Sequence, residues 1–495
     1  MRDYPEEFFI RKEKVEKLRE IGIEPYPYKF EVSHHSLEIK ADFEKLEGKE
    51  VSIAGRIITK RIFGKLNFAH LRDEQGDIQI VTQKGVTKVA GLSKEEDGSK
   101  FFKKFVDTGD ILGVVGEVFK TKTGEISVLA KEIQILSKAL LPLPEKWHGL
   151  QDKELKYRER YLDLIVNPES RRVFKTRVRI ISFIRNFLNS KGFFEMETPV
   201  LQPIYGGAMA KPFETYSNVL GTKLYLRISN ELYLKRLLVG GFEKVYEFSK
   251  DFRNEGIDRL HYPEFTLLEA YAAYWDYNDM LKMTEDFLSS LALEITGTYE
   301  IEYQGEKISF KPPFKRIDYI KSLTEHLGFN PLEVGVDELR NAAKFHEIDK
   351  YEKLPKHKLM DKLFDKLIGD HIKDPAFVTN HPVEISPLAK KHREIPGVTE
   401  RFELFILGME IANAFSELND PIDQRERFEK QVELRKLGDA EIPAEIDEDF
   451  LKALEVGMPP AGGIGYGIDR IVMLLTNQPS IRDVILFPQL RPKKE

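Results

Sequence analysis

The sequence of 495 residues predicts an α+β protein with two folded parts. Three observations predict this fold class. Short strand-like segments, separated by glycines, occupy residues 51–137. A proline-rich stretch, L-P-L-P-E-K-W-H-G-L, follows at residues 141–150 and predicts a domain boundary. Beyond it, amphipathic helices alternate with paired strands, which is typical of an antiparallel β-sheet flanked by helices.

The composition indicates a globular protein with a substantial core. Hydrophobic residues make up 41% of the chain and charged residues 32%. The chain has no cysteine, which excludes disulfides and thiolate zinc sites. The formal net charge of −6 argues against a general nucleic-acid coat but not against a specific RNA partner. The N-terminus lacks the pattern of a signal peptide, and no apolar run is long enough to span a bilayer. We therefore expect a cytoplasmic protein without a membrane partner.

The first 140 residues predict a small barrel preceded by a helical extension. Residues 5–21 have a helical pattern, and E-P-Y-P-Y-K-F at 24–30 cannot be helix because of its prolines. We assign residues 1–50 to this extension. Residues 51–140 contain five strands, with a helix near residues 94–107 before the fourth, which fits an OB-type barrel.

The barrel carries the groups that a single-stranded nucleic acid needs. Such barrels stack bases on aromatic side chains within a basic groove. Phe68, together with Arg56, Lys60 and Arg61, offers both. The alternative is that Phe68 is a core side chain, which is the commoner fate of a phenylalanine in a strand.

The second part begins after a linker at residues 141–165 and extends over residues 166–495. Residues 168–189 predict an amphipathic helix that ends before Gly192, and G-F-F-E-M-E-T-P-V-L predicts a strand ending at Pro199. Asn230 is expected to cap a helix that has Glu231 in its first turn. Residues 276–293 and 336–366 also predict helices, the latter within a helical insertion at about residues 320–372.

Residues 245–271 predict the hairpin around which the second part is organised. Gly256, Asp258 and Pro263 lie in its loop. Arg253 and Glu255 project to one face near the loop. On the return strand, three side chains share a common face: Phe265, Glu269 and Tyr271. Guanidinium, carboxylates and a flat ring suit a phosphate, a cationic group and a purine, respectively. Taken alone, the stretch is better explained as an antiparallel hairpin with an exposed salt bridge, and the rest of the chain changes this balance.

Two strands around Gly408 predict a second polar wall. Asn413, Phe415 and Glu417 share one face, and Glu410 can join them only through a β-bulge. Glu403 and Glu410 are expected to lie close together across the turn, where two carboxylates suit Mg²⁺. The alternative is a pair of solvated glutamates.

The last motif is a glycine-rich strand that enters an apolar helix carrying Arg470. Glycines at positions 463, 465 and 467 allow a ligand to approach the backbone closely. The stretch does not open a βαβ unit with an acidic residue about twenty positions later, so a dinucleotide-binding fold is rejected.

Three stretches together resemble the signatures of class II aminoacyl-tRNA synthetases. These are residues 192–201 with Pro199, residues 252–269 with F-R-N-E and H-Y-P-E-F-T-L-L-E, and residues 463–470 ending at Arg470. More specific stretches resemble the lysyl-tRNA synthetases of this class: R-Y-L-D-L, G-G-A-M-A-K-P-F-E-T, Y-L-R-I-S-N-E-L-Y-L-K-R-L-L-V-G-G, H-P-V-E-I-S-P-L-A-K and A-N-A-F-S-E-L-N-D-P. The resemblance covers nearly the whole chain. Tyr262 departs from it, since asparagine usually follows the histidine, and Arg259 is also displaced.

The resemblance implies ATP-dependent activation of L-lysine and its transfer to tRNA(Lys). It assigns the catalytic roles to Arg253 and Arg470, and ATP binding to Arg253, Glu255, His261, Phe265, Glu403 and Arg470. Glu403 and Glu410 would hold Mg²⁺. Lysine would be bound by Gly207, Glu231, Arg253, Glu269, Tyr271, Asn413, Phe415, Glu417 and Gly465. In the barrel, Arg56, Phe68 and Gln79 would contact the anticodon, and the protein would be a homodimer.

Three other functions are compatible with parts of this sequence. An aspartyl- or asparaginyl-type synthetase shares both folds, but it should place a cation near the amino acid's side chain, and the acidic set predicted here offers none. Ligases that attach lysine to a protein typically lack the barrel. A non-catalytic paralogue is disfavoured because Arg253, Arg470, Glu403 and Glu410 are all present.

Overall fold

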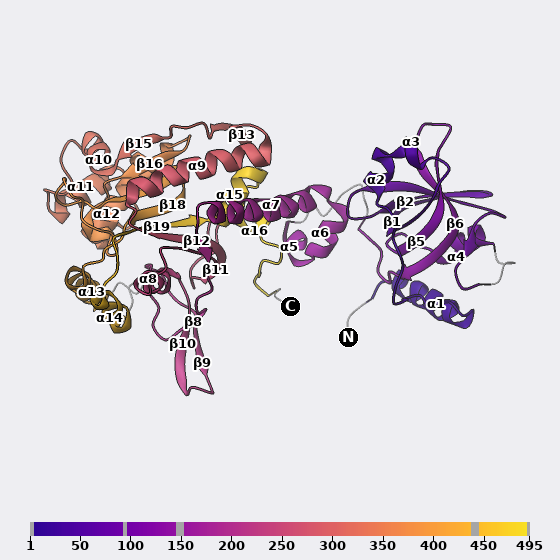
Figure 1. The fold of residues 1–495 in the computed structure, drawn as a ribbon, viewed down its shortest axis with the longest axis horizontal. Coiled ribbons are helices and arrows are strands. Elements are labelled where there is room, and N and C mark those ends of the chain that lie inside the picture. Colours follow the sequence, from indigo (N-terminus) through magenta and orange to yellow (C-terminus); the bar gives the residue numbers. More distant parts are fainter. Residues whose placement is uncertain (1–3, 93–96, 145–152, 437–444, 493–495) are drawn as a thin grey trace. The chain divides into compact units, whose positions relative to one another are not determined.

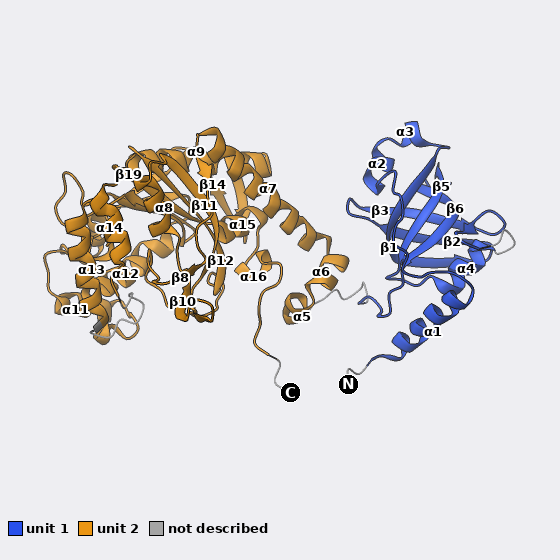
Figure 2. Cartoon of the chain, turned by 60° about the horizontal axis from the view of Figure 1, so that its bottom comes forward, with its two compact units in different colours: residues 1–151 blue, residues 152–495 orange. Residues whose placement is uncertain are grey.

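The computed structural model describes residues 4–92, 97–144, 153–436 and 445–492. The chain divides into two compact units, Met1–Gln151 and Asp152–Glu495, which are coloured separately in Figure 2. None of the helices in the described ranges is both long enough and apolar enough to cross a membrane.

The first unit is the predicted barrel. Its sheet has the order β3-β2-β1-β5-β6-β4, and an additional β3–β6 pairing closes it (Figure 1). The strands are β1 (Glu50–Phe63), β2 (Leu66–Arg72), β3 (Asp77–Gln83), β4 (Lys88–Val89), β5 (Ile111–Lys120) and β6 (Ile126–Ser137). Helix α4 (Gly98–Phe105) precedes β5, and the Asp97 side chain caps it by accepting from Ser99 N and Lys100 N. Residues 94–96 of the predicted helix lie outside the described residues.

The N-terminal segment packs on the barrel. Its helices are α1 (Glu6–Glu20), α2 (Ser36–Ala41) and α3 (Phe43–Leu46). Leu18, Ile23 and Ile39 are buried in one apolar cluster with the inward-facing barrel residues. The extension therefore shares the core of the barrel.

The second unit is built on an eight-stranded sheet with the order β15-β16-β17-β18-β19-β12-β11-β7. Its strands are β7 (Phe194–Glu195), β11 (Lys244–Phe252), β12 (Glu264–Ala273), β15 (Lys315–Asp318), β16 (Ala376–Thr379), β17 (Arg401–Ile406), β18 (Met409–Ser416) and β19 (Ala461–Gly467). The central pairings are antiparallel, as predicted. Both outermost pairings, β15–β16 and β7–β11, are parallel, so the sheet is mixed rather than purely antiparallel.

Three helices cover one face of this sheet: α7 (Pro168–Ser190), α9 (Tyr277–Thr296) and α15 (Ile468–Thr476). Alternate residues of the central strands point into that layer, among them Leu268, Ala270, Ala414, Ile464 and Tyr466. Because side chains alternate along a strand, the intervening residues point to the other face. That second face carries the site described below.

The remaining helices surround the sheet in smaller groups. Helices α10 (Tyr319–Leu327), α11 (Val336–Phe345) and α12 (Lys356–Leu367) form an apolar cluster of their own. Helices α8 (Glu231–Val239) and α14 (Glu448–Val456) pack together, next to α13 (Pro421–Lys436). Helices α5 (Lys153–Arg158), α6 (Arg160–Val166) and α16 (Ile481–Val484) complete the set. Small sheets are formed by β8 (Leu201–Gln202), β9 (Glu214–Ser217) and β10 (Thr222–Leu226), and by β13 (Glu300–Tyr303) and β14 (Glu306–Ser309).

Three local predictions were wrong in detail. The strand expected up to Pro199 is reduced to the two residues of β7, because only these pair with β11. The helix expected over residues 336–366 is two helices, α11 and α12, separated by a 3-10 turn at Tyr351–Lys353 and by Pro355. Asn230 occupies the N-cap position of α8, but its Nδ2 donates to Glu247 instead of capping the helix.

Arg160 fixes the C-terminal segment to the start of this unit. Its side chain is fully buried and donates to the backbone carbonyls of Arg482, Ile485 and Leu486. It also pairs with the buried Asp163 at 2.9 Å.

We expect Arg160→Met to destabilise the protein by about 3 kcal/mol or more, because it leaves the buried Asp163 carboxylate without its cation. The midpoint of urea unfolding measures this change. Arg172→Met, which removes an exposed arginine paired with Glu169, should change stability by less than about 0.5 kcal/mol. Equal midpoints for the two variants would contradict the role of Arg160.

Candidate active site

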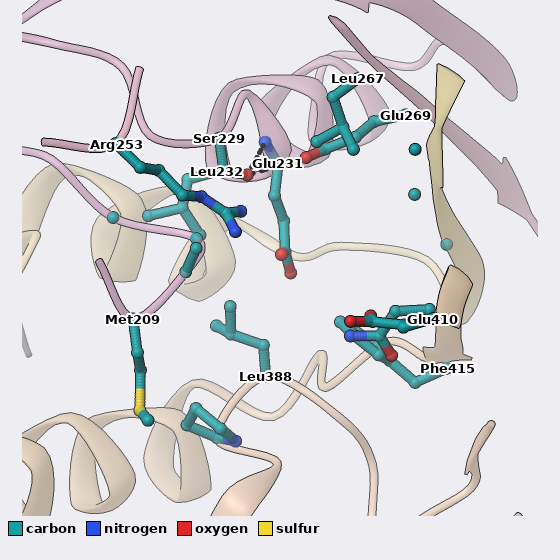
Figure 3. Close-up of a pocket in the computed structure, with 18 of the residues that line it drawn as sticks. Met209, Ser229, Glu231, Leu232, Arg253, Leu267, Glu269, Leu388, Glu410 and Phe415 are labelled. Carbon is teal, nitrogen blue, oxygen red and sulfur yellow. Dashed lines mark hydrogen bonds between the residues drawn. The ribbon is translucent and has the colours of Figure 1, made fainter. Parts of the chain in front are cut away.

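A cavity of about 460 Å³ opens on the sheet face opposite α9 and α15. Its lining includes every second-unit residue that the sequence singled out for a role: Gly207, Glu231, Arg253, Glu255, His261, Phe265, Glu269, Tyr271, Glu403, Glu410, Asn413, Phe415, Glu417, Gly465 and Arg470. In Figure 3, Arg253 and Glu231 reach into the cavity from one wall, across from Glu410 and Phe415. The structure thus gathers residues spread over more than half of the chain around one space.

Strand alternation and one bulge place these side chains. In β12, Glu269 and Tyr271 line the cavity while Leu268 and Ala270 enter the core. In β18, the pairing passes from Leu404–Ala412 to Phe405–Glu410, so Ile411 is an extra residue. This bulge lets Glu410 join Asn413 and Phe415 on the cavity wall.

Three buried glutamates dominate one end of the cavity. Glu231, Glu269 and Glu417 are 6%, 4% and 1% exposed, respectively. Ser229 Oγ donates to Glu269 Oε1 and Tyr271 Oη donates to Glu269 Oε2, both at 2.9 Å. Burial, together with the charges of Glu231 and Asp251, raises the pKa of Glu269 to about 8. Glu269 is therefore mostly protonated at neutral pH in the ligand-free protein.

Glu417 has an oxygen available for a ligand. No hydrogen-bond donor among the described residues reaches Glu417 Oε1, although the side chain is fully buried. A buried carboxylate oxygen without a donor is costly, and a bound ammonium group would supply one.

A cation that sequence reasoning missed lies among these acids. The Lys235 ammonium forms ion pairs with Glu231 Oε1 at 2.5 Å and with Glu417 Oε2. Its side chain is fully buried. The expectation that the acidic set contains no cation was therefore wrong. The spacing of four residues between Glu231 and Lys235 on α8 could have indicated the first of these ion pairs. No local pattern indicates that Glu417 lies on the other side of the Lys235 ammonium.

The opposite end of the cavity carries arginines. The Arg253 guanidinium lies 5.0 Å from the centre of the Phe265 ring, and its Nε has no acceptor among the described residues. Arg470 Nη1 donates to the Glu410 carbonyl at 2.5 Å, and Arg470 Nη2 lies 3.2 Å from His261 Nε2. Glu255 Oε1 accepts from the Lys211 backbone N–H at 3.3 Å. Arg401 was also missed; its Nε donates to Asn413 Oδ1 at 3.1 Å.

Glu403 and Glu410 fit a divalent cation by their chemistry. Burial alone would raise the pKa of Glu403, but the charge of Arg401 and the contact with His381 outweigh it and lower the pKa to about 2. Burial and the Glu403 charge raise the pKa of Glu410. Two carboxylates that repel each other are relieved by a divalent cation. Within the described ranges, no group of three or more His, Asp or Glu side chains has the geometry of a metal site, so such an ion would rely on other ligands as well.

The loop over this end is attached to the C-terminal segment. The Tyr262 hydroxyl accepts a hydrogen bond from the Gln489 backbone N–H, and the Arg259 carbonyl accepts from Ile481 N at 2.9 Å. Tyr262 is buried in the main core cluster. The unusual tyrosine therefore has a packing role at the edge of the cavity.

The three barrel residues lie on the adjacent strands β1, β2 and β3. Phe68 is half-buried and lies outside the barrel core, opposite Arg61 in the β1–β2 register. Gln79 Nε2 donates to Glu125 at 2.7 Å. Arg56 pairs with Arg72 in the register, four positions along β2 from Phe68, and donates to the Gly109 carbonyl at 2.7 Å. Arg61 is thus the arginine closest in register to Phe68.

Comparison with known proteins places this site in a family. Residues 152–491 match the model of tRNA synthetases class II (D, K and N), and residues 51–136 match the model of an OB-fold nucleic acid binding domain. The chain therefore belongs to the class II tRNA synthetases of the D, K and N group, and its barrel is an OB-fold.

Individual relatives narrow the assignment. A protein of Pelotomaculum thermopropionicum is 53% identical over 98% of this chain and 95% of its own length, and one of Carboxydothermus hydrogenoformans is 53% identical over 98% of both chains. A protein of Thermosipho africanus is 50% identical over 98% of this chain and 96% of its own. All three are named Lysine--tRNA ligase. Within its class, this chain is thus similar over nearly its whole length to proteins of the lysine branch.

Gly463 is expected to be essential for the shape of the acidic end. A Cβ atom there would overlap Glu417 Oε1 and lie 2.5 Å from Tyr271 Cε1. Gly463→Ala should therefore lower the stability of the ligand-free protein by about 1–3 kcal/mol, as overpacked sites do. At Gly465 the nearest atom to a Cβ would be Glu269 Cγ at 3.8 Å, so Gly465→Ala should leave the urea midpoint unchanged. Similar midpoints for both variants would contradict this geometry.

The raised pKa of Glu269 predicts how binding of a cationic ligand depends on pH. An ammonium group favours the ionised carboxylate, so binding should release about one proton below pH 8. The affinity for such a ligand should then rise about tenfold per pH unit from about pH 6 and level off near pH 8. Isothermal titration with L-lysine measures this slope. Glu269→Gln should abolish it, and a flat profile in the unmodified protein would contradict the shifted pKa.

Proposed function

We propose that this protein is a lysine–tRNA ligase, which activates L-lysine with ATP and transfers it to the 3′ end of tRNA(Lys). The observation that carries the proposal is the end of the cavity with three buried glutamates, one of which, Glu417, has an oxygen without a donor. Lysine is a ligand with two ammonium groups, and each buried charge needs a partner. The names of the relatives agree with this assignment.

In the first step, an oxygen of the lysine carboxylate attacks the α-phosphorus of ATP. The bond to the bridging oxygen breaks, pyrophosphate leaves and lysyl-adenylate forms. Arg253 is suited to stabilise the charge that develops on the α-phosphate, because its Nε has no acceptor among the described residues. Phe265 and Arg470 are suited to hold the adenine between a ring and a guanidinium, with His261 and Glu255 nearby.

In the second step, the terminal ribose 3′-hydroxyl of tRNA attacks the activated carbonyl carbon. AMP leaves with the electron pair of the anhydride bond, and an ester forms. No protein nucleophile is needed, so catalysis rests on position and on charge stabilisation. This agrees with a cavity that contains arginines and glutamates and a chain that has no cysteine.

The lysine itself is proposed to lie with its side chain toward Glu417 and Tyr271. Glu231 and the Gly207 backbone would receive the α-ammonium group, while Asn413 and Arg253 face the carboxylate. Glu269, Phe415 and Gly465 complete the walls. Gly207 adopts φ +85°, and a Cβ there would lie 2.7 Å from Ser229 Oγ, so glycine is needed to bring this backbone close.

A divalent cation, Mg²⁺, is proposed at Glu403 and Glu410, where it would supply positive charge next to the polyphosphate. The mutual repulsion that raises the pKa of Glu410 supports this position. Arg401, which pairs with Glu403 at 2.5 Å, would keep that carboxylate ionised and oriented.

Further proposals concern the rest of the assembly. The barrel, assigned to residues 51–140, would bind the anticodon through Phe68 and Gln79. Arg56, and Arg61 opposite Phe68 in the register, would supply positive charge. The other proposed parts of the chain are an N-terminal extension (1–50), a linker (141–165) and a catalytic domain (166–495). The catalytic domain contains an insertion at about residues 320–372. We also propose a homodimer located in the cytoplasm.

The aspartyl or asparaginyl alternative is not favoured. The lysine-branch relatives share about half of all residues with this chain. Lys235 does place a cation in the acidic end, but two carboxylates already neutralise it. An aspartate side chain would therefore meet a net negative charge.

Amino-acid-dependent ATP–pyrophosphate exchange tests the proposal. Among the twenty standard amino acids, L-lysine should give the strongest exchange. Glu417→Gln should lower kcat/KM for lysine about a hundredfold (~2.7 kcal/mol), because the side-chain ammonium loses a buried charged partner. KM for ATP should change little. Strongest exchange with aspartate or asparagine, or normal lysine kinetics in the variant, would refute the assignment.

A further inference from the structure

Lys235 is placed where a buried cation can act on ligand binding. It lies on α8, one turn after Glu231, and its ammonium joins Glu231 Oε1 to Glu417 Oε2. The side chains of Lys235 and Glu417 are both fully buried. The ammonium also lies 5.4 Å from the centre of the Phe415 ring and 6.0 Å from that of Phe450 on α14.

The surroundings of Lys235 contain few other charges. Glu231 on its own helix and Glu417, which directly follows β18, touch it. On β12, Glu269 and Tyr271 belong to the same titratable cluster, and Asp251 on β11 acts on Glu269. Arg401, on β17, acts on Glu231 from farther away, and its guanidinium already pairs with Glu403. Burial would lower the pKa of Lys235, but the charges of Glu231 and Glu417 raise it, so the side chain is an ammonium.

The number of charges at this end matters because the three glutamates are buried. Glu231, Glu269 and Glu417 carry three negative charges when all are ionised. The lysine ligand of the proposed function brings two ammonium groups, while its carboxylate faces the arginines. One negative charge would then remain unpaired in a buried site, which is costly. Lys235 is the third cation.

We propose that Lys235 is a specificity-determining positioning residue that completes the neutralisation of the three pocket carboxylates when lysine binds. It holds Oε2 of Glu417 and Oε1 of Glu231, and so leaves Oε1 of Glu417 to face the ligand. The inference rests on the proposed function, since it assumes a substrate with two ammonium groups. It concerns a residue that touches neither ATP nor the reacting atoms.

Without Lys235, one of the three acids has to keep a proton when lysine binds. Glu269, whose pKa is raised to about 8 by burial and by neighbouring charges, already holds a proton at neutral pH and would keep it. Lysine binding should then release no proton between about pH 6 and pH 8, and the affinity should no longer rise with pH. A residue that only supports the packing of α8 would not change this slope.

The experiment compares Lys235→Met, Glu269→Gln and the double variant with the unmodified full-length protein. Lysine affinity and proton release are measured by isothermal titration at about pH 6, 7 and 8, and the urea midpoint reports on folding. Arg236→Met is the matched control. It removes the next cation along α8, which pairs with Asp447 and with none of Glu231, Glu269 and Glu417. If Lys235→Met does not fold, Lys235→Gln removes the same charge and keeps hydrogen-bond donors.

Lys235→Met is expected to weaken lysine binding at least tenfold at pH 8 and to abolish the pH slope, while Arg236→Met retains both affinity and slope. In the Glu269→Gln background, where one acid is already neutral, loss of Lys235 should weaken binding less than threefold. Equal losses in both backgrounds, or a normal slope in Lys235→Met, would overturn the inference. Lack of lysine binding by the unmodified protein would instead refute the proposed function.

Discussion

The structure depends on holding three buried carboxylates close together at one end of the cavity. Glu231, Glu269 and Glu417 come from α8, from β12 and from the residue after β18, so no single element could supply them. Each would prefer water, and each is retained by specific neighbours: the Ser229 and Tyr271 hydroxyl groups for Glu269, and Lys235 for the other two. The result is an end of the cavity that is prepared for positive charge.

The central strands serve the core and the site at the same time. Along β12, β18 and β19, alternate residues enter the apolar layer under α9 and α15, and those between them line the cavity. In β19, the absence of a side chain at Gly463 leaves room for Glu417 and Tyr271 in the cavity. A shift of the register by one residue would bury acids in the core and expose apolar side chains to the ligand.

Much of this could be predicted from the sequence because the signals are local. Strand parity placed Glu269 and Tyr271 on one face, and the odd position of Glu410 required the bulge that the structure has at Ile411. The missed features are long-range. The pairing of Lys235 with Glu417 joins residues far apart in the sequence, and the parallel outer pairings depend on which strands meet. Asn230 has the chemistry of a cap, but Glu247, brought near by the β-sheet, binds its amide instead.

The attachment of the loop to the C-terminal segment couples two parts of the chain. Through Tyr262 and Gln489, and through Arg259 and Ile481, the strand connection above the nucleotide end shares hydrogen bonds with residues near the end of the polypeptide. A phenylalanine side chain at position 262, without the hydroxyl group, could not accept the hydrogen bond from Gln489. A protein fused after the C-terminal segment would therefore act on the loop as well as on that segment.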